Sequence, residues 1–116
     1  MKLAVEFPSV SYREGPAAVI RLAQSVERIG YDHIDIFDRV VIGIPSMVST
    51  PRRDTAGKSF YADHDAVMAR AAALKAMGFG WVTLNATAIF QAGARSVEAI
   101  TDSLARLHDR IRAEVG

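Results

Sequence analysis

The spacing of hydrophobic residues predicts three helices in this chain. From Pro16 to Ile29 apolar residues recur every three or four positions, and Pro16 suits the first turn of a helix because its missing N–H would be unpaired there anyway. A second helix is predicted over about residues 64–77, which are rich in alanine and follow the acidic residue Asp63. The third helix follows Ser96, whose side chain is a good N-cap.

Three short apolar runs predict strands. They are Leu3–Phe7, His33–Phe37 and Trp81–Asn85. These runs contain β-branched and aromatic residues, which prefer the pleated surface of a sheet. A long connection, residues 39–62, interrupts the regular pattern, and its length is typical of a lid, a binding loop or a disordered segment.

Apolar residues at both ends of this connection are predicted to contact the rest of the protein. Val40–Ile44 is too apolar to be left in water, so we expect it to pack on another surface. Phe60 and Tyr61 either stack on a bound ring or anchor the connection to the core.

The chain contains one helix–glycine–aromatic–strand unit twice. Residues 18–36 align without gaps with residues 66–84, so that the glycine ending each helix, Gly30 or Gly78, and the aromatic residue after it coincide. A repeated helix-then-strand unit favours parallel strands joined by right-handed crossovers. The predicted fold class is therefore α/β, with three parallel strands and three helices in a single domain of 116 residues.

Three parallel strands leave two sheet edges unpaired, and few helices are present to cover them. We therefore expect the protein to form a homodimer or a higher homo-oligomer. Val40–Ile44 is one predicted interface segment, and a narrow apolar stripe on the last helix is the other. The stripe consists of Val97, Ile100, Leu104, Leu107 and Ile111.

Composition and charge narrow the range of partners and sites. The net charge is +1 and no long basic run occurs, so nucleic acid is not expected as a partner. The absence of cysteine excludes disulfides and thiolate metal sites. No metal site is predicted, because helix capping explains the acidic residues Asp63 and Asp65 better. No apolar stretch suits a membrane span or a signal peptide, and we expect a cytoplasmic protein.

Candidate functional residues are predicted where strands end, because sites of α/β proteins gather there. Asp38 follows the second strand, where it either takes part in proton transfer or forms a cap or an ion pair with Arg39. Glu6 lies within the first strand, so its carboxylate either faces a polar cavity or lies at a sheet edge in water. Asn85 ends the third strand, where it either lines the same rim as Asp38 or is a turn residue.

Two parts of the sequence resemble a known family. Met1–Pro8, Val26–Asp32 and Phe37–Ile42 are similar to the opening of the bacterial luciferase-like monooxygenases, in particular the actinobacterial branch that uses the 8-hydroxy-5-deazaflavin coenzyme. Ala73–Leu84 and the helix after it are similar to the closing strand and helix of that family. Its members are TIM barrels of about 250 residues. The resemblance therefore implies a partial (βα) TIM-barrel-like unit that lacks the middle strands and is completed by oligomerisation.

The resemblance also implies a function. It implies that the protein binds a flavin such as FMN, or the deazaflavin coenzyme, and transfers hydride through it to or from a small-molecule substrate. Asp38 would be the catalytic or cofactor-contacting carboxylate, and Arg39, Glu6 and Asn85 would contact the cofactor. The family commonly has histidine where this chain has Arg39, which does not release a proton near neutrality but can hold an anionic flavin or a phosphate with two hydrogen bonds. The alternative is a non-catalytic oligomeric scaffold that keeps the α/β frame without the pocket.

Overall fold

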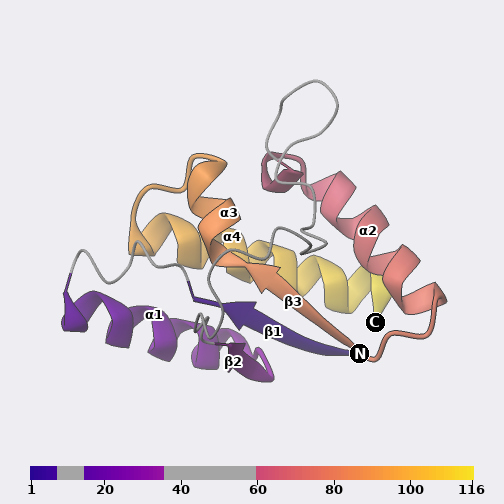
Figure 1. Ribbon diagram of the computed structural model, residues 1–116, viewed down its shortest axis with the longest axis horizontal. Coiled ribbons are helices and arrows are strands. Elements are labelled where there is room, and N and C mark those ends of the chain that lie inside the picture. The colour runs from indigo at the N-terminus through magenta and orange to yellow at the C-terminus, as the bar shows by residue number, and fades with distance from the viewer. Residues whose placement is uncertain (8–14, 36–59) are drawn as a thin grey trace, which may run out of the picture.

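Three parallel strands form one sheet at the centre of the protein (Figure 1). They are β1 (Lys2–Glu6), β2 (His33–Asp35) and β3 (Trp81–Asn85). The computed structural model describes residues 1–7, 15–35 and 60–116. Within these residues the predicted three-stranded parallel sheet is confirmed, and the strand order β2-β1-β3 makes β1 the central strand.

Four α-helices accompany the strands in the described part of the chain, one more than predicted. They are α1 (Pro16–Ile29), α2 (His64–Ala76), α3 (Ala86–Gln91) and α4 (Val97–Arg110). A 3₁₀ turn, Phe60–Ala62, precedes α2, and a π-helical turn, Ile111–Val115, extends α4. The side chains of Asp63 and Ser96 cap α2 and α4 as predicted. No helix within the described ranges is both long and apolar enough to cross a membrane.

The additional helix is α3, which lies between the predicted strand Trp81–Asn85 and the predicted helix after Ser96. The side-chain oxygen of Asn85 accepts a hydrogen bond from the backbone N–H of Ala88 at 3.0 Å and so caps a helix of six residues. Ala88 and Ile89 are then buried against the core. The sequence does not predict this helix, because a helix this short shows too few apolar positions for a helical period to be recognised.

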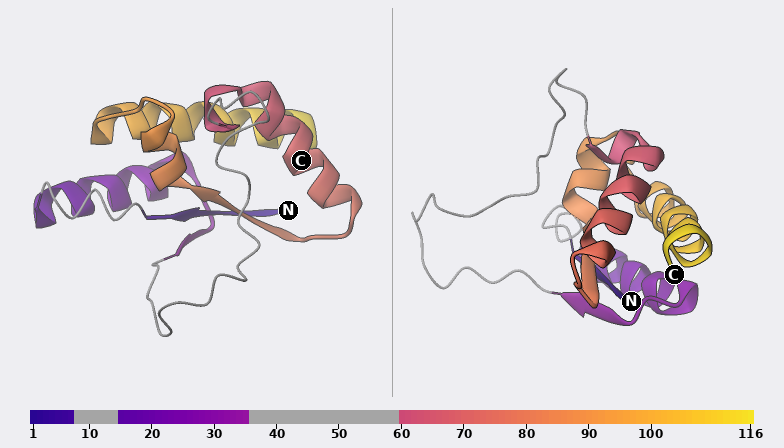
Figure 2. Two further views of the ribbon diagram at one scale, coloured as in Figure 1. Left: turned by 45° about the horizontal axis from the view of Figure 1, so that its top comes forward. Right: turned by 90° about the vertical axis from the view of Figure 1, so that its right-hand side faces the viewer.

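The helices and the hydrophobic core lie on one face of the sheet. The left view of Figure 2 shows α1 and α4 on the same side of the strands. Because side chains alternate along a strand, Leu3 and Val5 of β1 and Val82 and Leu84 of β3 point to this face, where they are buried. They share one cluster with residues of α1 and α4, among them Leu22, Val26, Ile100, Leu104 and Leu107.

The apolar stripe of the last helix belongs to this core. Its five members are at most 5% exposed, so the prediction that the stripe forms an oligomer interface is wrong. The stripe is already covered within the chain, because α4 packs against α1 and beneath the sheet. The other predicted interface segment, Val40–Ile44, lies outside the described residues, as does most of the 39–62 connection.

Asp32 closes the amino end of the sheet. Its carboxylate accepts hydrogen bonds from the backbone N–H of Leu3 at 2.9 Å and from Arg112 at 2.8 Å. These donors stabilise the charged form and hold the pKa of Asp32 below its ordinary value, with the Leu3 N–H acting most strongly. Arg112 also donates to the Met1 carbonyl oxygen, so the turn after α4 is joined to the start of β1.

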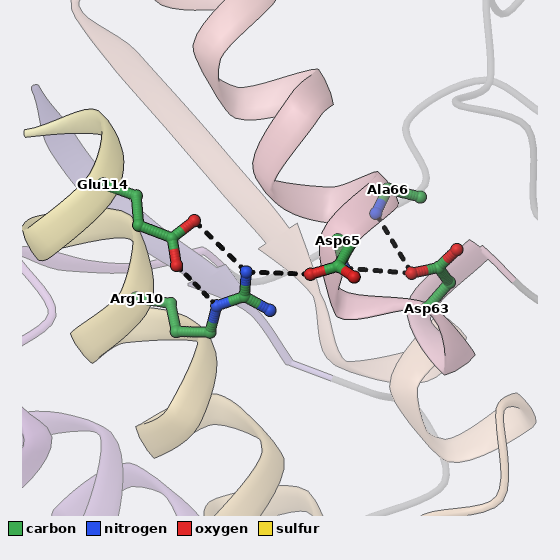
Figure 3. Close-up of polar contacts among 5 residues, drawn as sticks. All are labelled: Asp63, Asp65, Ala66, Arg110 and Glu114. Atoms are coloured by element: carbon green, nitrogen blue, oxygen red, sulfur yellow. Dashed lines mark hydrogen bonds and ion pairs between the residues drawn. The ribbon is translucent and has the colours of Figure 1, made fainter.

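Arg110 joins α2 to the end of α4 (Figure 3). Its guanidinium donates hydrogen bonds at 2.9 Å to Asp65 and to Glu114. Asp63 has a different role, because its carboxylate accepts two backbone N–H groups of the first turn of α2. Capping and an ion pair thus account for the two aspartates at this helix start. Among the residues that the structure describes, no group of three His, Cys, Asp or Glu side chains is placed to hold a metal ion.

Candidate functional site

The sheet face opposite the helices carries polar and aromatic side chains, and we call it the polar face. Strand register arranges these side chains in three rows from the amino end to the carboxyl end. The rows are Lys2 with Trp81, then His33, Ala4 and Thr83, and finally Asp35, Glu6 and Asn85. Register partners on parallel strands point to the same side of the sheet, so each row presents its side chains together.

The carboxyl-end row places two carboxylates side by side. Glu6 is in register with Asp35 on one side and with Asn85 on the other. Neighbouring strands lie about 4.8 Å apart, so these three side chains are within reach of one ligand. The structure thus brings together two predicted site residues, Glu6 and Asn85, and adds Asp35, which sequence reasoning missed. Glu6 is partly buried on the central strand, so the alternative that it lies at a sheet edge is wrong.

Asn85 connects this row to the end of the long connection. Its side-chain oxygen caps α3, so its local role is that of a helix cap and not of the predicted turn residue, and its backbone N–H donates to the Tyr61 hydroxyl at 3.0 Å. Tyr61 is buried, so it anchors the chain before α2 to the core, one of the two roles predicted for it. Burial raises the pKa of Tyr61 and the charge of Glu6 raises it further, so the hydroxyl keeps its proton at neutral pH.

Two contacts cross over the central strand in the middle of the polar face. The Thr83 hydroxyl donates a hydrogen bond to Asp35 at 2.9 Å. The rings of His33 and Trp81 stack with their centroids 4.1 Å apart and 14° between their planes. Both pairs join β2 to β3 across Ala4, whose small side chain is fully buried. These contacts hold Asp35 in place within the carboxyl-end row.

The internal repeat contained the signal for these contacts. When residues 18–36 are aligned with 66–84, His33 corresponds to Trp81. Asp35 likewise corresponds to Thr83. In the observed register His33 and Thr83 are both level with Ala4, so equivalent positions are offset by two residues along the strands, and an offset of two keeps their side chains on the same face. Their side chains can therefore meet over a small residue of the strand between them.

Two of the predicted site residues, Asp38 and Arg39, lie outside the described residues, so the polar face is built from the other two and from residues that the sequence analysis did not select. The chemistry of the carboxyl-end row is that of paired hydrogen-bond acceptors: two carboxylates accept N–H groups of a ligand. Comparison of the chain with family models, with curated proteins and with solved structures gives no match.

Proposed function

We propose that the polar face binds the ring system of a flavin such as FMN, or of the 8-hydroxy-5-deazaflavin coenzyme. The observation that carries this proposal is the row of Glu6, Asp35 and Asn85 at the carboxyl ends of three parallel strands. The strand order supports it, because the chain passes from β1 to β2 on one side and returns as β3 on the other. Ligands of open α/β sheets bind at such a reversal, outside the carboxyl ends of the strands.

The positions of the helices support a barrel-like unit. In a TIM barrel the helices lie outside a closed parallel sheet, so the first strand has the second and the last strands as neighbours. In this protein α1 and α4 lie on one face, and β1 pairs with β2 and with the strand that resembles the closing strand of the luciferase-like family. The polar face then corresponds to the inner wall of a partial barrel, and its carboxyl-end row to the ligand-binding rim.

The side chains of the polar face fit a flat heteroaromatic ring. The carboxylates of Glu6 and Asp35 accept hydrogen bonds from ring N–H groups, and the half-exposed Trp81 offers a surface for stacking. Arg39 is the proposed partner of an anionic ring or a phosphate, and Asp38 the proposed catalytic carboxylate. A bound flavin or deazaflavin supplies hydride-transfer chemistry, while these residues bind and orient it.

Titration of the purified protein with FMN, and separately with the deazaflavin coenzyme, tests the proposal. Binding is expected to shift the cofactor's absorbance and to quench Trp81, the only tryptophan. Glu6→Gln and Asp35→Asn are each expected to raise Kd about tenfold or more, since a hydrogen bond to a charged group contributes about 1.5–3 kcal/mol. Glu98→Gln, on the exposed surface of α4, is the matched control and leaves Kd unchanged. If neither cofactor responds to the protein, the proposal is refuted.

Asp38→Asn tests the proposed role of that carboxylate. The variant is expected to bind the cofactor more weakly or to lose turnover while its circular dichroism spectrum stays that of the wild type. Unchanged binding together with unchanged turnover contradicts the assignment.

We further propose that copies of the chain associate, because within the described residues both edges of the sheet lack a partner strand. A specific observation favours association: Met77, Phe79 and Trp81 are 63%, 56% and 47% exposed. Contiguous apolar groups of this size in water mark interaction surfaces. A non-catalytic oligomeric scaffold, the second candidate function, shares this surface, so the cofactor titration is what distinguishes the two candidates.

A further inference from the structure

We infer that one edge of this protein docks head to tail onto the opposite edge of a second copy. The docking elements are an apolar groove and an exposed apolar stripe, which is a different set of residues from the buried stripe on α4. The stripe consists of Met77 and Phe79, which lie between α2 and β3, whereas the ring of Trp81 turns onto the polar face and stacks on His33. The groove lies between α1 and β2 and has a volume of about 450 Å³. This inference names the surfaces of the association proposed above and does not depend on cofactor binding.

The groove is apolar inside and acidic at its rim. Ile20 of α1 and Ile34 of β2 line it and are both exposed. The charged residues that line it are Glu27 and Asp32, and no lysine or arginine is among the lining residues. Asp32 is paired with Arg112, so the exposed Glu27 is the main source of negative charge at the rim.

The stripe is flanked by positive charge. Lys75 lies two residues before Met77, where its ammonium group also donates to the Val115 carbonyl at 2.6 Å, and Lys2 is the register partner of Trp81. No acidic residue occurs from residue 75 to residue 83. A basic stripe and an acidic groove attract each other, whereas two stripes or two grooves repel. Charge therefore favours a stripe-to-groove junction over a symmetric junction of two stripes.

The internal repeat indicates what kind of cover the stripe lacks. Tyr31 and Phe79 are equivalent positions, yet Tyr31 is 8% exposed and Phe79 is 56% exposed. Tyr31 is covered by α4, where its hydroxyl donates to the Leu104 carbonyl at 2.7 Å and its ring lies 5.1 Å from that of His108. Among the described helices none covers Phe79 in this way. In the assembly the α1 helix beside the partner's groove supplies the missing cover.

The two surfaces also lie at matching levels of the sheet. The stripe leads into β3 and the groove adjoins the start of β2, so both are near the amino end, at opposite edges of the order β2-β1-β3. When β3 of one copy lies beside β2 of the next, the parallel sheet continues and pairs two edges that have no partner strand among the described residues. Phe79 leaves roughly 100 Å² to be buried. The paired edges and the outer surface of α2 supply the rest of the roughly 800 Å² per partner that a stable interface needs.

Sedimentation of the full chain over a range of concentrations tests the inference. Phe79→Asp places a charged side chain in the stripe, and Ile34→Asp places one in the groove. Each variant is expected to sediment as a monomer. Asp102→Lys, an exposed position on α4, is the control and associates like the wild type. Circular dichroism confirms that each variant is folded. A wild-type protein that remains monomeric at its highest soluble concentration overturns the inference.

Mixing the two monomeric variants is the sharper test. The Phe79→Asp variant keeps its groove and the Ile34→Asp variant keeps its stripe, so one intact junction forms and the mixture is expected to give dimers. A symmetric junction of two stripes could not form between one intact and one altered stripe. Absence of dimers in the mixture therefore overturns the inference. If Ile34→Asp fails to fold, an exchange of charges is the test. Glu27→Lys and Lys75→Glu are each expected to raise the dissociation constant of the junction about tenfold or more. The variant with both substitutions is expected to restore the wild-type dissociation constant. Additive weakening in the double variant contradicts the junction.

Discussion

Replacing Ala4 with valine tests how the polar face is held together. Ala4 is fully buried in the central strand, where the stacked pair of His33 and Trp81 and the hydrogen bond from Thr83 to Asp35 cross it. Valine adds two methyl groups at the point where the side chains of β2 and β3 meet. The two crossing pairs must then move away from the strand, or the strand must move away from them.

The expected loss of stability is about 1–3 kcal/mol. With their centroids 4.1 Å apart, the two rings are in van der Waals contact. They can make room for a larger side chain only by moving apart. Overpacking a buried site costs about 1–3 kcal/mol, and losing an aromatic contact adds about 0.5–1.5 kcal/mol. The higher strand preference of valine offsets less than about 1 kcal/mol of this cost. Since urea slopes are about 1–3 kcal/mol per molar for small proteins, the unfolding midpoint is expected to fall by about 1 M.

Urea unfolding followed by circular dichroism measures the stability, and the emission of Trp81 reports on the stack. Ala4→Val is expected to lower the midpoint and to shift the emission of the folded state to the red as the indole becomes more exposed. Ala4→Gly is the matched control: it costs about 0.5–1 kcal/mol in backbone entropy but leaves the space over the strand, so the emission stays unchanged. A valine variant with wild-type stability and wild-type emission refutes this account of the polar face.

Substitutions at three further residues test other parts of the structure. Because folding lowers the pKa of Asp32, its contribution to stability is present above the ordinary value of 3.8 and is lost as the pH falls through the lower, folded value. Asp32→Asn is therefore expected to be less stable than the wild type at neutral pH and to lose less stability in acid, as urea midpoints over a pH series would show. Asn85→Ala is expected to cost about 1 kcal/mol through loss of the α3 cap, and Asn85→Asp much less; equal melting temperatures for the two variants contradict the capping role. Tyr31→Phe removes the hydrogen bond to the Leu104 carbonyl and is expected to lower stability by about 1 kcal/mol in urea titrations, and an unchanged midpoint would show that the bond contributes nothing.

The helices that local signals define could be predicted from the sequence. Pro16 at the start and Gly30 after the end fix α1, because the proline ring suits a first turn and glycine accepts the left-handed conformation observed there, with φ at 108°. Helix α3 has no comparable signal, since its cap, Asn85, is also the last residue of a strand. The surface that covers the stripe on α4 could not be predicted either. A stripe of this kind suits a sheet or a partner helix, and only the fold decides between them.

Only part of the candidate site could be predicted, because its composition depends on how the strands pair. Glu6 and Asn85 were selected because polar residues at the ends of strands suggest a site, and they do belong to one row. Asp35 was missed because the second strand was expected to continue to Phe37, which directed attention to Asp38 beyond it. Which residue of β2 lies level with Glu6 depends on the register between strands, and register is set by packing across the whole sheet and not by the local sequence.

The same internal repeat links the polar face to the proposed assembly. Within one copy, Asp35 and Thr83 are equivalent positions 48 residues apart, and they meet diagonally across the central strand, where Asp35 is level with Glu6 and Thr83 with Ala4. In the proposed head-to-tail arrangement β3 of one copy lies beside β2 of the next, which brings equivalent positions of the repeat near each other between copies. Glu27 and Lys75 are such a pair, and their charges are opposite. Two copies of an unmodified repeat would have placed like charges there and repelled each other, so the change of charge between the repeats is what permits the junction.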